Sequence, residues 1–182
     1  MIKFIPNILS FFRLAAPVFL TPMILENDFK SAFVIFSMAA SSDFLDGYWA
    51  RKFHVSSDLG RILDPLADKV LMVTSYALLA YVKFIPTYVA TLVVGRDFLI
   101  LNVVAICKFR RIPLKIQPLL SSKINTAIQL LFLVGVLACK SLEMNVPWLI
   151  ELSRLIVSVS TIFSGAEYVQ KYYWIKDKIF GR

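Results

Sequence analysis

The segment SDFLDGYWARKFHVSSDLGRILDPLADKV, residues 42–70, places four aspartates at fixed intervals in a chain that is otherwise strongly apolar. Asp43 and Asp46 lie three residues apart, and Asp64 and Asp68 lie four apart, so on helices each pair faces one way. An aspartate near the centre of a bilayer costs roughly 2.5–3.5 kcal/mol, and four of them need compensation. Hard divalent cations such as Mg²⁺ prefer carboxylate oxygens and supply it. The segment therefore predicts a membrane enzyme that handles phosphates through metal ions.

The bulk composition is that of a membrane protein. Of 182 residues, 58% are hydrophobic, and the mean hydropathy is +0.71. A soluble domain needs far less apolar surface, and the length suits one membrane domain over residues 1–182. The net charge of +8 comes from basic residues that flank apolar runs. We therefore expect membrane lipids with anionic head groups, and no nucleic acid, as partners.

Apolar runs along the chain predict an all-α, polytopic membrane protein with about six transmembrane helices. Pro65 should make the third helix begin late or bend, because proline has no backbone N–H to donate. The helices are expected at about residues 8–25, 29–50, 60–82, 86–108, 121–139 and 147–173.

The placement of lysine and arginine predicts the orientation in the membrane. The connections at 51–61 and 108–123 and both tails are rich in basic residues, whereas the opposite connections offer mainly Lys30, Lys83 and Lys140. The positive-inside rule then makes both termini cytoplasmic and brings the aspartates near the cytoplasmic face. The first residues have neither a cleavable-signal pattern nor the long extension of a mitochondrial precursor, so we expect a bacterial inner (cell) membrane.

The aspartates belong to a longer pattern of eight fixed positions. It reads Asp43-x-x-Asp46-Gly47-x-x-Ala50-Arg51, then eight residues, then Gly60-x-x-x-Asp64-x-x-x-Asp68. Each position has an ordinary frequency of roughly one in twenty, so a chance match is negligible. The pattern is complete here, and the chain resembles the CDP-alcohol phosphatidyltransferase family over nearly its whole length.

This resemblance implies phospholipid biosynthesis by transfer of a phosphatidyl group from CDP-diacylglycerol to an acceptor hydroxyl, with release of CMP. It implies two divalent cations, Mg²⁺ or Mn²⁺, that neutralise the pyrophosphate of the donor. Asp43, Asp46 and Asp64 are then metal ligands. Asp68 is the general base that takes the proton of the acceptor hydroxyl, and it also touches a metal.

The smaller motif residues have two interpretations each. Gly47, Ala50 and Gly60 let helices pack closely in lipid, and by resemblance they also admit the cytosine and the pyrophosphate of CDP-diacylglycerol. Arg51 is either a fork for a phosphate or a positive-inside anchor. Ser57 resembles a position that contacts the nucleotide, although a solvated loop serine fits equally well.

The N-terminal run Pro-Asn-x-x-Ser-x-x-Arg contains Asn7 and Arg13 and resembles an element of the glycerophospholipid branch of the family. We assign Asn7 to the CDP-diacylglycerol site and Arg13 to the phosphate of the acceptor. Arg96 and Lys123 interrupt or open later apolar spans and are candidates for gripping the same phosphate. The alternative for Arg96 is a buried pair with its neighbour Asp97.

The identity of the acceptor rests on finer resemblances. The Arg96–Asp97 pair and the run SKINTAIQ, residues 122–129, look like the branch that makes cardiolipin from phosphatidylglycerol. The branch that uses glycerol 3-phosphate and makes phosphatidylglycerophosphate more often shows Arg-Glu, and a second lysine where Asn125 stands. A phosphodiester carries less negative charge than a phosphomonoester, so a binding site with one lysine fewer is physically reasonable for it.

An alternative interpretation, from another functional class of membrane protein, is a cation channel or transporter, whose acidic cluster would bind permeating ions. Such a pore has no need of the glycine, alanine and arginine positions of the pattern. The family resemblance also implies a homodimer that forms through membrane helices.

Overall fold

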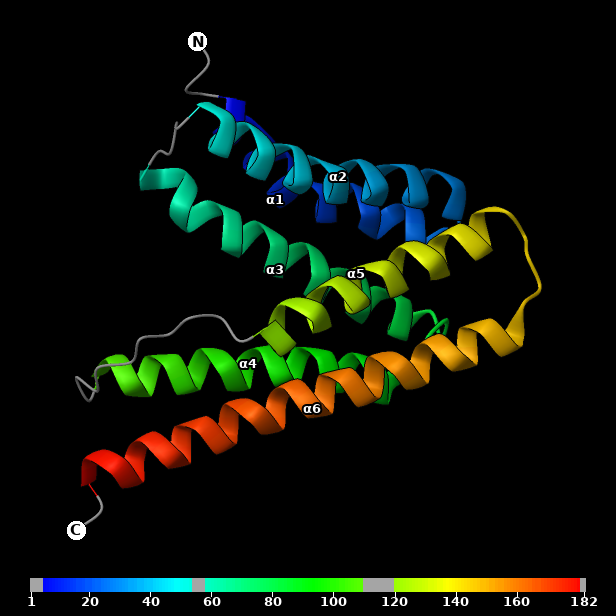
Figure 1. Ribbon diagram of the computed structural model, residues 1–182. Coiled ribbons are helices and arrows are strands. Elements are labelled where there is room, and N and C mark those ends of the chain that lie inside the picture. Colours follow the sequence, from blue (N-terminus) through cyan, green and yellow to red (C-terminus); the bar gives the residue numbers. More distant parts are fainter. Residues whose placement is uncertain (1–4, 54–57, 110–119, 181–182) are drawn as a thin grey trace. The chain divides into compact units, whose positions relative to one another are not determined.

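The computed structural model describes residues 5–53, 58–109 and 120–180, with side chains over 10–42, 65–107, 109, 120–171 and 173. The described residues form six α-helices and no strand, which confirms the all-α prediction (Figure 1). The helices are α1 (Ile5–Leu25), α2 (Phe29–Phe53), α3 (Asp58–Tyr81), α4 (Thr87–Phe109), α5 (Leu120–Ser141) and α6 (Pro147–Phe180).

The third helix differs from its expected start. We expected Pro65 either to delay or to bend this helix, but α3 begins at Asp58 and carries Pro65 inside it. The delayed start was wrong because a helix loses only one hydrogen bond at a proline, and membrane helices tolerate that loss where neighbouring groups take up the carbonyl. α1 likewise contains two prolines, Pro17 and Pro22.

Three helices in the described part of the chain are long and apolar enough to cross a membrane: Thr87–Cys107, Leu120–Ser141 and Pro147–Lys171. Their 21 to 25 residues exceed the roughly 20 that a hydrocarbon core of about 30 Å requires. Most of their residues are not buried, as lipid-facing helices require. These spans indicate a membrane protein, whereas six crossings and cytoplasmic termini stay predictions.

The chain divides into two compact units, so the single domain expected over residues 1–182 stays a prediction. Unit 1 comprises Met1–Thr87 and Leu133–Val146, and unit 2 comprises Tyr88–Phe132 and Pro147–Arg182. In unit 1, α2 and α3 both pack along α1 (Figure 1). Ala16, Ala32, Ala39 and Ala67 on these helices are fully buried, and such small side chains let helix backbones approach closely.

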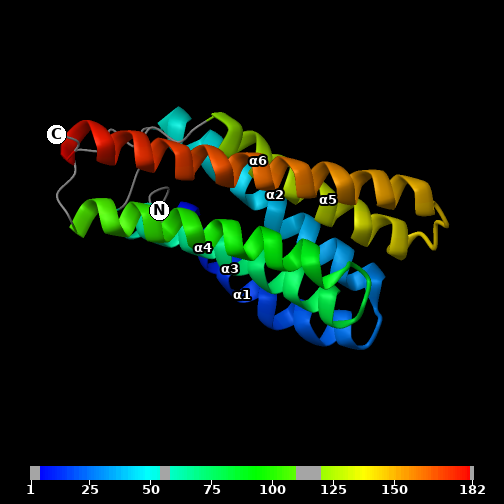
Figure 2. The same cartoon turned by 90° about the horizontal axis from the view of Figure 1, so that it is seen from below.

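Unit 2 contains α4, the first part of α5 and α6. In Figure 2, α4 and α6 run alongside each other, and a buried hydrogen bond joins them at Arg96 and Ser164. The outer face of α6 carries exposed large apolar side chains, among them Trp148, Leu155 and Phe163. An exposed apolar face is stable against lipid hydrocarbon but not against water, which agrees with a membrane location.

Three of the helices that end in unit 1, namely α1, α3 and α5, close in the same way. Asn27, Lys83 and Glu143 each follow a helix with a positive φ of 62°, 60° and 54°. The next amide then bonds back to the carbonyl five residues earlier, at 2.8 Å in all three turns. This is the Schellman motif, which satisfies the last carbonyls of a helix and reverses the chain sharply.

Glu143 offers a test of this backbone geometry because its side chain is exposed. Glu143→Val should lower the free energy of unfolding by roughly 1–2 kcal/mol, since a β-branched residue is strained at positive φ. Glu143→Gly should instead raise it by up to about 1 kcal/mol. Thermal melting in detergent compares the two variants. Equal melting temperatures for valine and glycine would contradict the left-handed conformation.

Candidate functional site

The aspartate motif lies on two consecutive helices of unit 1. Asp43 and Asp46 fall in the second half of α2, and Asp64 and Asp68 fall in the first half of α3. Both helices pack against α1, so one three-helix group carries the whole motif. Of the four aspartates, Asp68 has a described side chain.

The other motif side chains lie outside the described side chains, so their roles stay predictions. This holds for the predicted metal ligands and for most of the predicted CDP-diacylglycerol site, namely Asp43, Asp46, Asp64, Asn7, Gly47, Ala50, Arg51 and Gly60. Ser57 lies outside the described residues altogether.

Asp68 is held by Arg13 of α1. The Arg13 Nη1 atom donates to Oδ1 of Asp68 at 2.5 Å, across 55 residues of sequence. The Arg13 side chain is fully buried, whereas 41% of the Asp68 side chain is exposed. The sequence pattern predicts Asp68 as base and metal ligand and Arg13 as a ligand for the acceptor phosphate, and the structure brings the two side chains into direct contact.

Small residues beside this pair allow the contact. Ala16 lies one helical turn after Arg13, and Ala67 directly precedes Asp68; both are fully buried. A larger side chain at either position would need space between α1 and α3, which pack together here. An arginine and an aspartate in separate apolar spans were the sequence signal for this pair, because each lowers the cost of burying the other.

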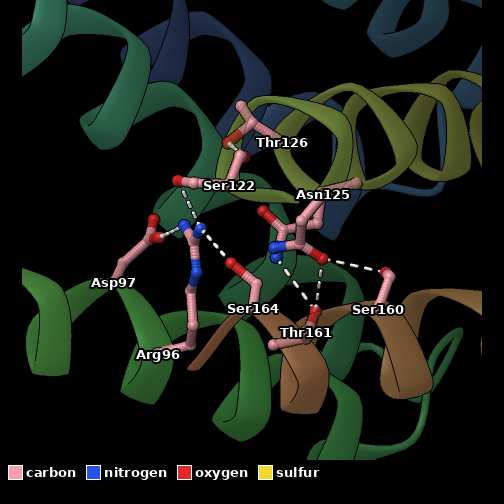
Figure 3. Close-up of polar contacts among 9 residues, drawn as sticks. Arg96, Asp97, Ser122, Asn125, Thr126, Ser160, Thr161 and Ser164 are labelled. Carbon is pink, nitrogen blue, oxygen red and sulfur yellow. Dashed lines mark hydrogen bonds and ion pairs between the residues drawn. The ribbon is translucent and has the colours of Figure 1, made fainter. Parts of the chain in front are cut away.

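Unit 2 holds a second buried charge cluster, drawn in Figure 3. Arg96 donates from Nη1 to Oδ1 of Asp97 at 2.8 Å, and from Nη2 to the hydroxyls of Ser122 and Ser164 at 2.6 and 2.7 Å. Arg96 and Asp97 are 6% and 5% exposed. The buried neighbour pair that the sequence left open is therefore present, because the long arginine side chain reaches the carboxylate of the next residue.

A network of neutral groups continues from this cluster along α5 and α6. The Asn125 side-chain oxygen accepts hydrogen bonds from the hydroxyls of Ser160 at 2.8 Å and Thr161 at 3.2 Å (Figure 3). Gln129 donates to the Thr161 hydroxyl at 3.1 Å. In hydrocarbon such groups have no water to bond, so they pair across helices.

The sequence analysis did not identify the hydroxyl groups on α6 that bond to Arg96 and Asn125. Ser160, Thr161 and Ser164 interrupt an apolar span at positions i, i+1 and i+4, which places them close together on a helix. That spacing was the available signal. Two buried donors in this region, Arg96 Nε and Asn125 Nδ2, have no hydrogen-bond partner in the part of the chain that the structure describes. Lys123, the other predicted acceptor ligand, has an exposed side chain.

Comparison with known proteins decides the family. The model of the CDP-alcohol phosphatidyltransferase family matches residues 3–166, which include the complete eight-position pattern. The chain belongs to this family. A CDP-alcohol phosphatidyltransferase has no need of a pore, so the cation channel or transporter loses its support.

Curated relatives carry two kinds of name. The chain is 35% identical over 150 residues to the cardiolipin synthase (CMP-forming) of Rattus norvegicus, covering 74% of this chain and 50% of that protein. It is 33% identical over 179 residues to a cardiolipin synthase/hydrolase fusion protein of Schizosaccharomyces pombe, covering 90% of this chain and 30% of the fusion. The chain thus spans half or less of the length of these two relatives.

The second kind is a CDP-diacylglycerol–glycerol-3-phosphate 3-phosphatidyltransferase of Aquifex aeolicus. It is 36% identical over 137 residues, which cover 72% of this chain and 74% of the relative. The first kind of name gives cardiolipin as the product with formation of CMP, and the second gives CDP-diacylglycerol and glycerol 3-phosphate as substrates.

The residues present fit a divalent cation. CDP-alcohol phosphatidyltransferases use such cations, and the motif supplies four carboxylates without histidine or cysteine. Oxygen donors of this kind suit Mg²⁺ or Mn²⁺, whereas zinc favours nitrogen and sulfur. The carboxylate of Asp68 is half-exposed and therefore accessible from outside its helix.

Proposed function

We propose that this protein transfers the phosphatidyl group of CDP-diacylglycerol to a glycerol-containing acceptor and releases CMP. The observation that carries the proposal is the complete aspartate pattern inside the matched family region, on helices that pack against one another through α1. The contact between Asp68 and Arg13 supports it, because a base needs a defined position.

In this proposal the motif aspartates hold the cations, and Asp68 is also the base. Asp43, Asp46, Asp64 and Asp68 hold two divalent cations, which when bound neutralise the pyrophosphate of the donor. Asp68 accepts the proton of the acceptor hydroxyl as that oxygen forms its bond to the phosphorus attached to diacylglycerol. The bond from this phosphorus to the oxygen of CMP breaks, and CMP leaves with the electron pair. The donor site comprises Asn7, Gly47, Ala50, Arg51, Ser57 and Gly60.

The acceptor that we propose is phosphatidylglycerol, so that the product is cardiolipin. Asp97 offsets the positive charge of Arg96 at 2.8 Å, and a weakly cationic site suits a singly charged phosphodiester better than a doubly charged phosphomonoester. Arg96 Nε and Asn125 Nδ2 are buried donors of the kind that a phosphate oxygen accepts from, and Lys123 adds an exposed cation. Glycerol 3-phosphate is the alternative, favoured by the relative from Aquifex aeolicus.

We place the active site at the cytoplasmic face of a bacterial inner membrane, since basic residues flank the motif and CDP-linked lipid forms where nucleotides are available. A homodimer formed through membrane helices stays a prediction.

The acceptor is decided by one assay. Purified protein is given CDP-diacylglycerol with labelled phosphatidylglycerol or with labelled glycerol 3-phosphate. We expect CMP release and labelled cardiolipin from phosphatidylglycerol, at a rate at least about tenfold above that with glycerol 3-phosphate, because an unmatched phosphate charge costs more than about 1.4 kcal/mol. Exclusive use of glycerol 3-phosphate would overturn the choice of acceptor and leave the family reaction intact.

Removal of the divalent cations should abolish the activity of the enzyme. EDTA should lower CMP release to background, because no cation then neutralises the donor pyrophosphate beside the motif aspartates, and added Mg²⁺ or Mn²⁺ should restore the rate. EDTA that is saturated with Mg²⁺ beforehand is the matched control and should have no effect. Activity that is indifferent to chelation would rule out the metal assignment.

A further inference from the structure

We infer that Arg13 is a positioning residue, which holds the carboxylate of Asp68 in place and does not grip the phosphate of the acceptor. The inference rests on the proposed function, in which Asp68 is the base. It changes the role that the sequence pattern suggested for Arg13 and adds a residue outside the aspartate motif to the machinery of the reaction.

The burial of the two partners differs in an informative way. Arg13 has no exposed side-chain surface, whereas 41% of the Asp68 side chain is exposed. The Arg13 guanidinium has no exposed surface, and the partner that it meets on α3 is a carboxylate, to which it donates a charged hydrogen bond. A buried anchor beside a half-exposed carboxylate is the arrangement expected when the carboxylate does the chemistry and the arginine fixes it.

The contact also has the geometry of an anchor. The Arg13 Nη1 atom lies 2.5 Å from Oδ1 of Asp68, a short hydrogen bond between charged groups, and such bonds are stronger than those between neutral groups. One engaged oxygen fixes the plane of the carboxylate and therefore the direction of its second oxygen. Because α1 and α3 pack together and the side chains of Ala16 and Ala67 on these helices are fully buried, Arg13 has a rigid base from which to do this.

A base that is displaced by about 1 Å can lose roughly 100-fold in rate, since proton transfer needs a defined approach. Loss of the anchor should therefore lower kcat and leave the affinity for acceptor nearly unchanged. Loss of a phosphate ligand has the opposite signature, a raised KM for the acceptor with a smaller effect on kcat. A residue that only braces α1 against α3 would change the melting temperature and neither kinetic constant.

The experiment compares Arg13→Gln, Arg13→Lys and the matched control Arg154→Gln in the full-length protein, purified in detergent. Arg154 also forms an ion pair, with Glu151 at 2.6 Å, but on α6 and with Glu151 64% exposed. CMP release is measured over a range of phosphatidylglycerol concentrations at saturating CDP-diacylglycerol, and thermal melting gives the folded fraction of each variant.

We expect Arg13→Gln to lower kcat by about 100-fold, with the acceptor KM within about twofold of wild type. Arg13→Lys should recover part of kcat, because the ammonium keeps the charge but lacks the planar fork. Arg154→Gln should match wild type in both constants.

A raised acceptor KM with kcat retained in Arg13→Gln would overturn the inference in favour of a phosphate ligand. A lower melting temperature with both constants unchanged would overturn it in favour of a purely structural brace. If Arg13→Gln does not fold, Arg13→Lys decides, and an undiminished kcat in that variant counts against the inference. A wild type inert with every acceptor would overturn the proposed function first and this inference with it.

Discussion

Asp68→Asn should reduce the turnover of phosphatidyl transfer by about 10²–10⁴-fold, the usual contribution of a general base. Asparagine has the same shape as aspartate, and its oxygen can still accept the hydrogen bond from Arg13. It cannot take up the proton of the acceptor hydroxyl, and it offers a weaker ligand to a cation. CDP-diacylglycerol binding should be largely spared, because the other motif residues remain.

The measurement is CMP release from CDP-diacylglycerol by the folded fraction of the variant, with donor affinity measured separately by direct binding. Correction for folding matters because Asp68→Asn removes the negative charge next to a fully buried arginine. Asp28→Asn is the matched control. Asp28 is an exposed cap of α2, where its carboxylate accepts from the amide of Ser31 at 3.2 Å, and asparagine caps helices equally well. Full turnover in Asp68→Asn would remove Asp68 from the role of base.

Arg96→Met should destabilise unit 2 by about 3–5 kcal/mol, the cost of leaving one partner of a buried ion pair alone. Asp97 is 5% exposed and would lose the compensating charge of Arg96. The hydroxyls of Ser122 and Ser164 would lose their shared donor as well. The double variant Arg96→Met/Asp97→Leu should regain most of the loss, since an apolar pair of similar volume has no charge to compensate.

Denaturation in detergent micelles, followed by helix content, compares these variants with Arg154→Met. That control breaks an ion pair whose acidic partner is mostly exposed, so it should cost less than about 1 kcal/mol. An Arg96→Met variant that denatures like wild type would show that the pair contributes nothing to stability. A double variant as unstable as Arg96→Met would show that the cost does not come from the loss of the Arg96 partner of Asp97.

Helix positions were largely predictable because they follow from local patterns. Each of the six apolar runs became a helix, since a run of that length in hydrocarbon must satisfy its backbone bonds internally. The second helix continues to Phe53, close to the expected end near residue 50, because charged residues such as Arg51 and Lys52 remain good helix formers after hydropathy falls. α6 likewise continues to Phe180.

Side-chain contacts between helices could not be predicted from such local patterns. Arg96 and Asp97 are neighbours, so their contact was open to sequence reasoning, but Ser164 lies 68 residues away on another helix. Arg13 was assigned to an acceptor phosphate from a sequence motif, and a motif specifies residue types and spacing but not which side chains become neighbours in the fold. Which carboxylate meets a buried arginine depends on which faces of two helices pack, and that choice is not written in either helix alone.

The sequence by itself determined the helices and the chemistry that the chain carries, because apolar run length and the eight-position pattern are local properties of residue type and spacing. The tertiary structure alone decided that Arg13 meets Asp68, across 55 residues, and that Arg96 is shared among three helices. The physical reason is that a buried charge takes the nearest compensating group, and nearness is created by small residues such as Ala16 and Ala67 that let helices pack closely.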